Sequence, residues 1–405
     1  MKVPLLDLRR QNGPLQQELL DAFQRVLDSG QYILGKEVEE LERRGAAVSG
    51  TRHAIGVSSG TDAILLALMS LGVGPGDEVI CPSFTFFATA GCIARTGARP
   101  VFADSCPICC NVDVASMERL ITSRTKALMP VHLFGQSADM DAVTTLAEKH
   151  GLAVIEDAAQ ALGAAHRGRP VGSIGTFGTF SFFPSKNLGG FGDSGLLTTN
   201  DDSLAEKARV LRGHGAKPKY FHKMVGGNFR MDPLQAALLG VKLPHLDDYG
   251  RKRSENARHY NSQLGQVEGA VVNCAANGGC GGDADLAELR QRGALLLLPA
   301  PHEGRQHIWN QYTVRAVAGE KWNRQQSPRD ALRSLLQERN IGSEIYYPLP
   351  MHLQECFASS GPHAAAPVSE ALAAQCLSIP VFPELTAAER GAVIDALTDF
   401  LHDNA

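Results

Sequence analysis

From residue 54 to residue 156 the sequence alternates short apolar runs with segments of helical periodicity. The apolar runs lie at 54–58, 78–81, 99–103, 126–132 and 152–156, and the helical segments lie at 62–71, 85–96, 113–121 and 140–150. Strands that alternate with helices of this length form a mostly parallel sheet covered on both faces. Ligands of such α/β sheets bind at the carboxyl ends of the strands, so residues that follow these runs are candidate site residues.

The chain has 405 residues, which is longer than one hydrophobic core usually serves. We expect an N-terminal helical segment at 1–50, a large domain at 51–250 and a small C-terminal α+β domain at 251–405. The domain boundary would fall near residue 250, within a helix-rich stretch at 201–265. One predicted helix, at 15–28, would dock on the body through Leu15, Leu19, Phe23, Val26 and Leu27.

Composition narrows the class of partner. The formal net charge is -4, and no run of five or more Lys or Arg residues occurs. We therefore expect small-molecule partners and no nucleic-acid partner. The first ten residues become charged too soon for a secretory signal, and no apolar run is long enough to span a bilayer. We therefore expect a soluble, cytoplasmic protein.

Nine cysteines are scattered along the chain, and an odd number at these spacings does not form a disulfide framework. Cys106, Cys109 and Cys110 could supply half of a metal site, but no second Cys/His pair lies nearby at zinc-ligand spacing. We expect no metal there, and no special role for Cys274 and Cys280 in the glycine-rich loop predicted at 267–285.

Lys186 stands out because it follows the apolar run 180–184 and precedes a glycine-rich turn. Desolvation there would lower its pKa and make it a nucleophile toward an aldehyde. The alternative is a lysine that extends its head into water from a strand end. The nearby GFGDSG at 190–195 matches the G-x-G-x-x-G pattern, but it precedes a strand instead of opening a helix, so a dinucleotide site is not expected.

Two further features follow predicted strands. The segment 58–63 (SSGTDA) joins a strand to a helix, where the N–H groups of Thr61 and Asp62 could bind a phosphate; the alternative is an ordinary N-cap. Asp157 ends the run 152–156, with Gln160 three residues on; the alternative is an N-cap for a helix starting at Ala158. A phosphate site, a carboxylate that holds a protonated ring nitrogen and a desolvated lysine are together what pyridoxal 5'-phosphate requires.

Six ordered motifs carry a resemblance that runs from residue 3 to about 400. They are GQYILG at 30–35, SGTD at 59–62, PSFTF at 82–86, EDAAQ at 156–160, SFFPSKN at 181–187 and NFRMD at 228–232. In these motifs the chain resembles the DegT/StrS family of nucleotide-sugar aminotransferases. The resemblance implies fold type I of the pyridoxal phosphate enzymes, in which a mostly parallel seven-stranded sheet lies between helices in the large domain.

The resemblance also implies a role for each matching residue. Lys186 would bind the cofactor covalently and move the substrate's proton, while Asp157 would pair with the ring nitrogen. Gln160 would meet the ring hydroxyl, and Phe86 would stack on the ring. The phosphate would be held by Thr61, Asp62 and Ser181 of one subunit and Asn228 of the other.

For the sugar nucleotide, the resemblance points to Gly30, Tyr32, Ser185, Arg230, Tyr346 and Tyr347. The chain departs from the family pattern at two places. Relatives that act on uronic acids often have His-Tyr-Pro where this chain has Tyr346, Tyr347 and Pro348, and the common Gly-Asp-Gly-Gly is here GDSG at 192–195. The first departure leaves the sugar open.

The implied function is amino transfer by a homodimer from an amino acid, with glutamate favoured, to a keto-sugar on UDP or dTDP. Amination at carbon 3 is favoured over carbon 4. One alternative is a sugar dehydratase of the same fold, in which histidine replaces the lysine or an iron–sulfur cluster is added; Lys186 and the scattered cysteines disfavour both forms. A regulator of transcription is the third reading, which the charge of -4 and the intact lysine site disfavour.

Overall fold

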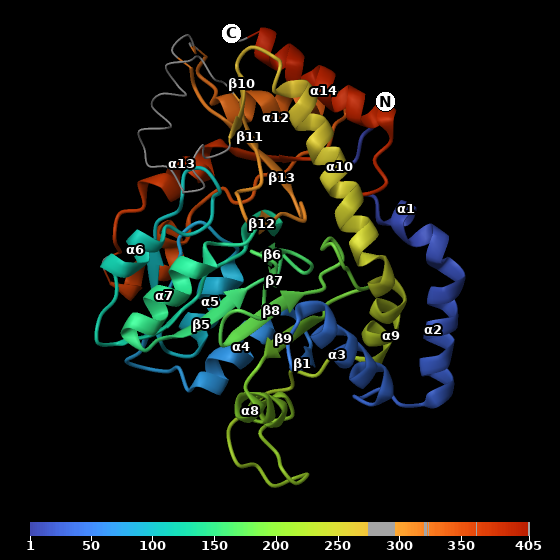
Figure 1. Cartoon of the computed structure of the whole chain (residues 1–405), viewed down its shortest axis with the longest axis vertical. Helices are drawn as coiled ribbons and strands as arrows, with labels where there is room; N and C mark the ends of the chain where they lie inside the picture. Colours follow the sequence, from blue (N-terminus) through green and yellow to red (C-terminus); the bar gives the residue numbers. More distant parts are fainter. Residues whose placement is uncertain (274–295, 320–321, 323, 362, 404–405) are drawn as a thin grey trace.

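The computed structural model describes residues 1–273, 296–319, 322, 324–361 and 363–403. Its largest sheet has seven strands, and helices pack around it (Figure 1). In spatial order the strands are β1 (His53–Val57), β9 (Gly195–Thr199), β8 (Phe177–Ser181), β5 (Ala153–Asp157), β4 (Thr125–Leu128), β2 (Glu78–Pro82) and β3 (Arg99–Ala103). β9 runs antiparallel to both of its neighbours and the other neighbouring strands are parallel. The predicted mostly parallel sheet is therefore confirmed.

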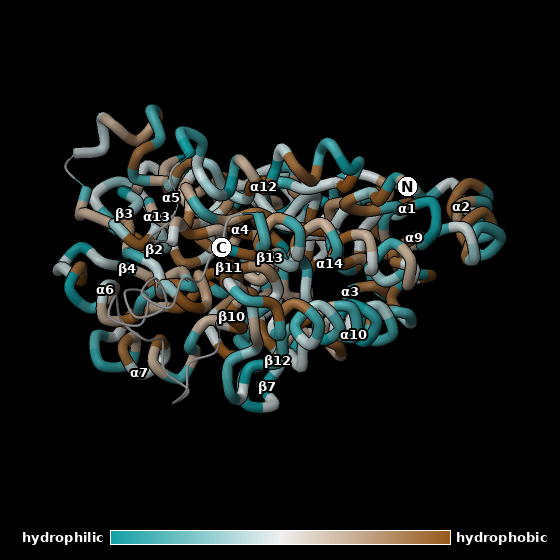
Figure 2. The backbone as a smooth tube through the Cα atoms, turned by 90° about the horizontal axis from the view of Figure 1, so that it is seen from above, coloured by the Kyte–Doolittle hydropathy of each residue, from teal (hydrophilic) through white to brown (hydrophobic). Residues whose placement is uncertain are grey.

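Helices that alternate with the strands, together with one helix before β1 and one after β9, pack around the sheet. They are α3 (Lys36–Ser49), α4 (Gly60–Leu71), α5 (Phe87–Arg95), α6 (Val114–Arg119), α7 (Met140–His150) and α8 (Asp202–Arg212). α4 packs against β8, β9, α5 and α8, and Ile64, Leu66 and Leu68 on it are almost inaccessible to water. Figure 2 shows the contrast between this hydrophobic helix and the hydrophilic α10 (Leu246–Leu264) at the surface.

A second, four-stranded sheet lies beyond the large one. Its order is β10 (Ala270–Asn273), β11 (Leu296–Pro299), β13 (Tyr312–Ala316) and β14 (Cys376–Ile379). Its core includes residues of the helices α10, α12 (Pro328–Glu338) and α14 (Ala387–His402), and α13 (Pro367–Gln375) precedes β14. The remaining strands, β12 (Arg305–Gln306), β6 (Ala165–His166) and β7 (Arg169–Pro170), form a small third sheet. The expected boundary near residue 250 falls inside α10, and the division into domains stays a prediction.

The N-terminal segment contacts α9 (Pro233–Lys242) and also the region around the four-stranded sheet. α1 (Leu8–Asn12) is followed by α2 (Gln16–Ser29), which packs on α9. Val3 bridges to Ile341, and Arg10 donates a bidentate hydrogen bond to Glu389 at 2.8 and 2.9 Å. Both chain ends lie near the top in Figure 1. Short 3-10 helices complete the fold: η1 (Gly13–Leu15), η2 (Leu133–Gly135), η3 (Leu243–His245), η4 (Met351–Leu353) and η5 (Glu355–Ser360).

Several sequence predictions were wrong in detail. The helix predicted at 15–28 does form, but it buries Leu19, Ala22 and Val26, while Phe23 and Leu27 on the expected docking face are 45% and 48% exposed. The strand predicted at 126–132 ends at Leu128, because Pro130 has no N–H to donate to a sheet.

No helix begins at Ala158, where residues 158–163 form turns instead. The helix-rich stretch at 201–265 is interrupted by a long loop at 213–232, after which α9 starts at Pro233 with Asp232 at its N-cap, as expected. In the loop predicted at 267–285, residues 270–273 form β10. Residues 274–285, with Cys274 and Cys280, lie outside the described residues.

Membrane insertion was not expected. Within the described ranges, no helix is both long enough and apolar enough to cross a bilayer.

Candidate active site

A cavity of about 1190 Å³, including open solvent at its mouth, lies where the parallel strands of the large sheet end. Residues that follow β1, β2, β4, β5 and β8 contribute to its walls, as expected for an α/β sheet. The predicted site residues that line it are Thr61, Phe86, Asp157, Gln160, Ser181, Ser185, Lys186, Tyr346 and Tyr347. Four of the six sequence motifs, at 59–62, 82–86, 156–160 and 181–187, thus converge on one place.

Lys186 enters the cavity from the turn between β8 and β9. Burial lowers the pKa of its amine from 10.5 to about 8, and the carboxylate of Asp157 partly opposes this shift. The turn is held in place because Asn187 donates from Nδ2 to the carbonyl of Ile308 at 2.9 Å and accepts at Oδ1 from Asn310 at 2.8 Å. The lysine is therefore a desolvated amine on a fixed support, not one that extends into water.

Asp157 is the last residue of β5 and is only 4% exposed. Its Oδ2 accepts a 2.7 Å hydrogen bond from Thr89, and its Oδ1 accepts one from the Ala159 N–H at 3.2 Å. Burial raises the pKa of Asp157, and the hydrogen bond from Thr89 and the charge of Lys186 act against that. A carboxylate in this position has room for a cationic partner in the cavity.

Thr89 is a contact that the sequence interpretation missed. It lies on α5, and its hydroxyl is also 3.0 Å from the hydroxyl of Thr85, so Thr85, Thr89 and Asp157 form a chain. The spacing of Thr85 and Thr89 predicts that they share a helical face, but nothing local connects that face to a residue 68 positions later.

A second buried pair lies behind Asp157. Glu156 and His132 are both fully buried, and their side chains are hydrogen-bonded at 2.9 Å. Glu156 also accepts from the backbone N–H groups of Gly172, Ile174 and Gly175. Burial alone would raise the pKa of Glu156, but the hydrogen bonds from His132 and the backbone outweigh it and the pKa lies below 4.5. This pair, also missed from the sequence, fixes the end of β5.

The segment predicted to hold a phosphate forms the N-terminus of α4, and the N-cap that was the alternative reading is present. Ser59 is the N-cap of α4 and accepts the Asp62 N–H at 3.0 Å, while the Asp62 carboxylate, in the first turn of the helix, accepts from Ser58 at 2.6 Å. Asp62 is not among the residues that line the cavity, whereas Gly60 and Thr61 are. A methyl group at Gly60 would lie 2.7 Å from Ser181 Cβ, so glycine is required for this close approach.

Aromatic side chains form another part of the cavity wall. The ring of Phe86, 55% exposed, lies 6.0 Å from that of Tyr347, and the Tyr347 hydroxyl accepts a 3.0 Å hydrogen bond from Gln160 Nε2. Gln160 Oε1 accepts from the Phe134 N–H at 2.6 Å, which fixes the amide orientation. Burial raises the pKa of Tyr347, and the charge of Asp157 adds to the shift, so the phenol stays neutral.

Besides Asp62, four predicted residues do not line the cavity of the single chain: Gly30, Tyr32, Asn228 and Arg230. Gly30 ends α2 with φ 62°, and Tyr32 is 50% exposed. Asn228 bridges to Gly213, and Arg230 bridges to Val57. The Arg230 Nε is buried and has no hydrogen-bond partner in the described part of the chain.

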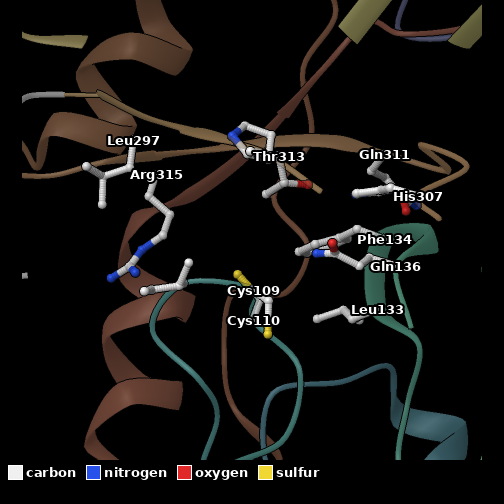
Figure 3. Close-up of a pocket in the computed structure, with 13 residues that line it drawn as sticks. Cys109, Cys110, Leu133, Phe134, Gln136, Leu297, His307, Gln311, Thr313 and Arg315 are labelled. Carbon is white, nitrogen blue, oxygen red and sulfur yellow. The ribbon is translucent and has the colours of Figure 1, made fainter. Parts of the chain in front are cut away.

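A second cavity, of about 430 Å³, lies between the loops at 106–110 and 133–136 and the four-stranded sheet (Figure 3). It shares Leu133 and Gln311 with the first. Cys109, Cys110 and Arg315 line it, and the Arg315 guanidinium donates to the carbonyl of Pro107 and to Gln375. Across the described residues, no group of three or more His, Cys, Asp or Glu side chains is placed to hold a metal.

Comparison with known proteins gives consistent results. A model of the DegT/DnrJ/EryC1/StrS aminotransferase family matches residues 14–278 and 283–398. A protein of Geobacillus stearothermophilus named pleiotropic regulatory protein is 46% identical over 401 residues, which cover 99% of each chain. The UDP-N-acetyl-3-dehydro-alpha-D-glucosamine 3-aminotransferase of Acidithiobacillus ferrooxidans is 40% identical over 400 residues, covering 99% of this chain and 98% of that protein.

Among solved structures, the crystal structure of DesV from S. venezuelae in complex with a ketimine intermediate is 41% identical. It matches with a TM-score of 0.87 over 99% of this chain and 98% of its own. These matches confirm the expected fold type I architecture, the aminotransferase class and pyridoxal 5'-phosphate as the cofactor. The chain belongs to the DegT/DnrJ/EryC1/StrS aminotransferase family.

Proposed function

We propose that this chain transfers an amino group from an amino acid, with glutamate as the donor, to carbon 3 of a keto-sugar linked to UDP or dTDP. The observation that carries the proposal is the pairing of Lys186, whose pKa is about 8, with the buried Asp157 in one cavity of a family member. The name of the A. ferrooxidans relative supports carbon 3 and a UDP sugar.

The residues of the cavity fit pyridoxal phosphate. Asp157 would face the ring nitrogen, Phe86 would cover the ring, and Gln160 would meet the ring hydroxyl. The N-terminus of α4 with Thr61, together with Ser181, would hold the phosphate, since backbone N–H groups at a helix N-terminus attract anions. When bound, the cofactor supplies an electron-withdrawing ring that takes up the electrons of a broken C–H bond.

Lys186 then has two tasks, to bind the cofactor and to move a proton at Nζ. An amine with a pKa of about 8 is partly unprotonated near neutral pH, so it can accept a proton and return it. Asp157, held by Thr89, would pair its carboxylate with the protonated ring nitrogen when the cofactor is bound. The turn fixed at Asn187 would keep Nζ in place while it accepts and returns the proton.

The test is an assay of purified protein with glutamate and a panel of UDP- and dTDP-linked 3-keto and 4-keto sugars. The product is identified by mass spectrometry and NMR. Amination at carbon 3 is expected, and amination at carbon 4 alone would overturn that part of the proposal. No amination of any sugar, with cofactor bound, would favour the non-enzymatic reading that the name of the G. stearothermophilus relative suggests.

We further propose a cytoplasmic homodimer with sites shared between subunits. Free thiols such as Cys81, Cys92 and Cys356 persist in reducing compartments, which supports the cytoplasm. The loop at 213–228 projects from the body below α8 (Figure 1) and exposes Tyr220 and Phe221 at 78% and 68%. Large exposed apolar side chains on a projecting loop suit contact with a second copy, which would bring Asn228 and Arg230 to the neighbouring cavity.

Mixing two inactive variants tests this arrangement. Lys186→Ala subunits and Asn228→Ala subunits should recover about a quarter of the wild-type activity, since random pairing gives half hybrids and each hybrid has one intact site. The assay measures specific activity after co-refolding, with each variant refolded alone as the control. Verified mixed dimers without recovery would show that Asn228 acts within its own subunit.

Arg230 should distinguish a carboxylated sugar from an uncharged one. The buried Nε of its guanidinium has no hydrogen-bond partner among the residues that the structure describes, and a planar fork can bind a uronate bidentately. Arg230→Lys should therefore reduce kcat/KM by about tenfold or more for a 3-keto uronate, and much less for the matching 6-deoxy sugar. Equal losses on both sugars would indicate that Arg230 binds the diphosphate instead.

A further inference from the structure

Three side chains outside the cavity form a hydrogen-bonded row. Ser83 Oγ lies 2.6 Å from Nδ1 of His352, and Nε2 of His352 lies 3.2 Å from Oε1 of Glu370. Ser83 is fully buried, the His352 side chain is 6% exposed and the Glu370 side chain is 50% exposed. None of the six family motifs includes His352 or Glu370. The buried serine cannot reach a substrate, so a nucleophilic role for this row is excluded.

The row joins two segments that both line the active-site cavity. Ser83 follows β2 directly and lies three residues before Phe86. His352 lies in η4, five residues after Tyr347. The segments are also tied by a backbone hydrogen bond of 2.7 Å from the Met351 N–H to the Ser83 carbonyl. The bond from Ser83 to His352 is therefore a cross-link between two neighbouring segments of the cavity wall.

The segment at 83–86 contacts both the aromatic wall and the chain of hydroxyl groups that leads to Asp157. The Phe84 ring packs edge-on against Tyr347 at 6.1 Å, and Phe86 lies 6.0 Å from the same tyrosine. Between them, Thr85 contacts Thr89, which donates to Asp157. A shift of Ser83 would move the aromatic wall and loosen the hydroxyl chain that orients Asp157.

Glu370 fixes the other end of the imidazole. It lies in the first turn of α13, whose start is anchored by Asp104 through the N–H groups of Val368 and Ser369. Asp104 follows β3, the neighbour of β2 in the large sheet. Histidine is suited to this place because its two nitrogens point in different directions and can bind Ser83 and Glu370 at once.

We propose that His352 is a positioning residue that sets the Phe86 and Tyr347 wall and the Asp157 hydroxyl chain of the cofactor cavity through its bond to Ser83. The proposal rests on the proposed function only in taking the cavity as the cofactor site. It is independent of which sugar is aminated.

The experiment compares two substitutions that each keep one of the two bonds. Asparagine places a polar atom near the position of Nδ1, so His352→Asn keeps the contact to Ser83. Glutamine reaches the position of Nε2, so His352→Gln keeps the contact to Glu370, removes the 2.6 Å side-chain bond to Ser83, and leaves the buried Ser83 hydroxyl only the 3.4 Å bond from the backbone N–H of residue 352. The measurements are the dissociation constant of pyridoxal phosphate for apoprotein, the circular dichroism of the bound cofactor, and the melting temperature of the apoprotein.

His352→Gln and Ser83→Ala should each weaken cofactor binding by about tenfold and change the cofactor's circular dichroism, because Phe86 and Tyr347 are no longer held in fixed positions. His352→Asn should stay within about threefold of wild type. His53→Gln is a matched control, because it alters another histidine–carboxylate contact, the 2.7 Å bond between His53 and Asp202. His53 begins β1, at the end of the large sheet away from the cavity, so this substitution should leave cofactor binding unchanged.

Equal effects of His352→Asn and His352→Gln would overturn the proposal. So would a lower melting temperature with unaltered cofactor binding and circular dichroism, because His352 would then serve stability alone. These measurements need no sugar, so a wrong sugar assignment leaves the outcome intact. If wild-type apoprotein did not bind pyridoxal phosphate at all, the proposed function would fail before this inference was tested.

Discussion

Lys186→Ala is expected to abolish amino transfer and to remove the absorbance of covalently bound cofactor. The lysine is the amine in the cavity whose pKa is lowered to about 8, and its turn is fixed through Asn187. Loss of a group that moves protons costs about 10²–10⁴ in rate by itself, and loss of the covalent link adds to that. The visible spectrum and single-turnover amino transfer measure both effects. A variant with wild-type absorbance and activity would contradict the assignment of Lys186.

Lys242 provides a matched control within the same chain. Burial lowers its pKa to about 8 as well, but its Nζ donates to the carbonyl of Gly189 at 2.6 Å and it does not line the cavity. Reduction of wild-type holoenzyme with borohydride should therefore attach the cofactor to the peptide that contains Lys186. Label on the Lys242 peptide would show that a low pKa alone, without the cavity, selects the amine.

The placement of these groups was predictable because it follows from a simple regularity. Strands that alternate with helices are parallel, their carboxyl ends meet, and Asp157 and the segment before α4 each follow such a strand. Lys186 was identified from its unusual apolar surroundings. The roles of Phe86 and Tyr347 came from resemblance to a family, since neither has a local pattern that indicates a cofactor.

Other features could not be read from local sequence. The contact of Thr89 with Asp157 and that of Ser83 with His352 join residues 68 and 269 positions apart, and periodicity carries no information about such distances. Phe23 and Leu27 were placed on a buried face because their spacing suits a helix, whereas α2 docks through Ala22 and its neighbours instead. An apolar residue on a helix can equally face a second copy of the chain.

Asp157→Asn is expected to reduce amino transfer by about 10²-fold or more while the apoprotein becomes as stable as the wild type or more stable. The physical reason is the direction in which burial shifts the pKa of Asp157. Burial raises the pKa of Asp157 above 3.8, so the folded apoprotein holds this proton more tightly than the unfolded chain does, and ionisation of the carboxyl group lowers the free energy of unfolding as the pH rises from the unfolded pKa through the folded pKa. An amide removes that cost. It also removes the charge that would hold a protonated ring nitrogen.

Glu156→Gln, one residue earlier on β5, should behave in the opposite way. The pKa of Glu156 lies below 4.5, because the hydrogen bonds from His132 and the backbone outweigh burial, so its charge stabilises the fold above that pH and the contribution is lost as the pH falls through the folded pKa. Removing one member of such a buried pair costs about 3–5 kcal/mol. The two variants are compared by the free energy of unfolding of their apoproteins in urea at pH 7 and by the amino-transfer rates of their holoenzymes. If Asp157→Asn lost as much unfolding free energy as Glu156→Gln, Asp157 would be a structural residue that caps the turn through the Ala159 N–H.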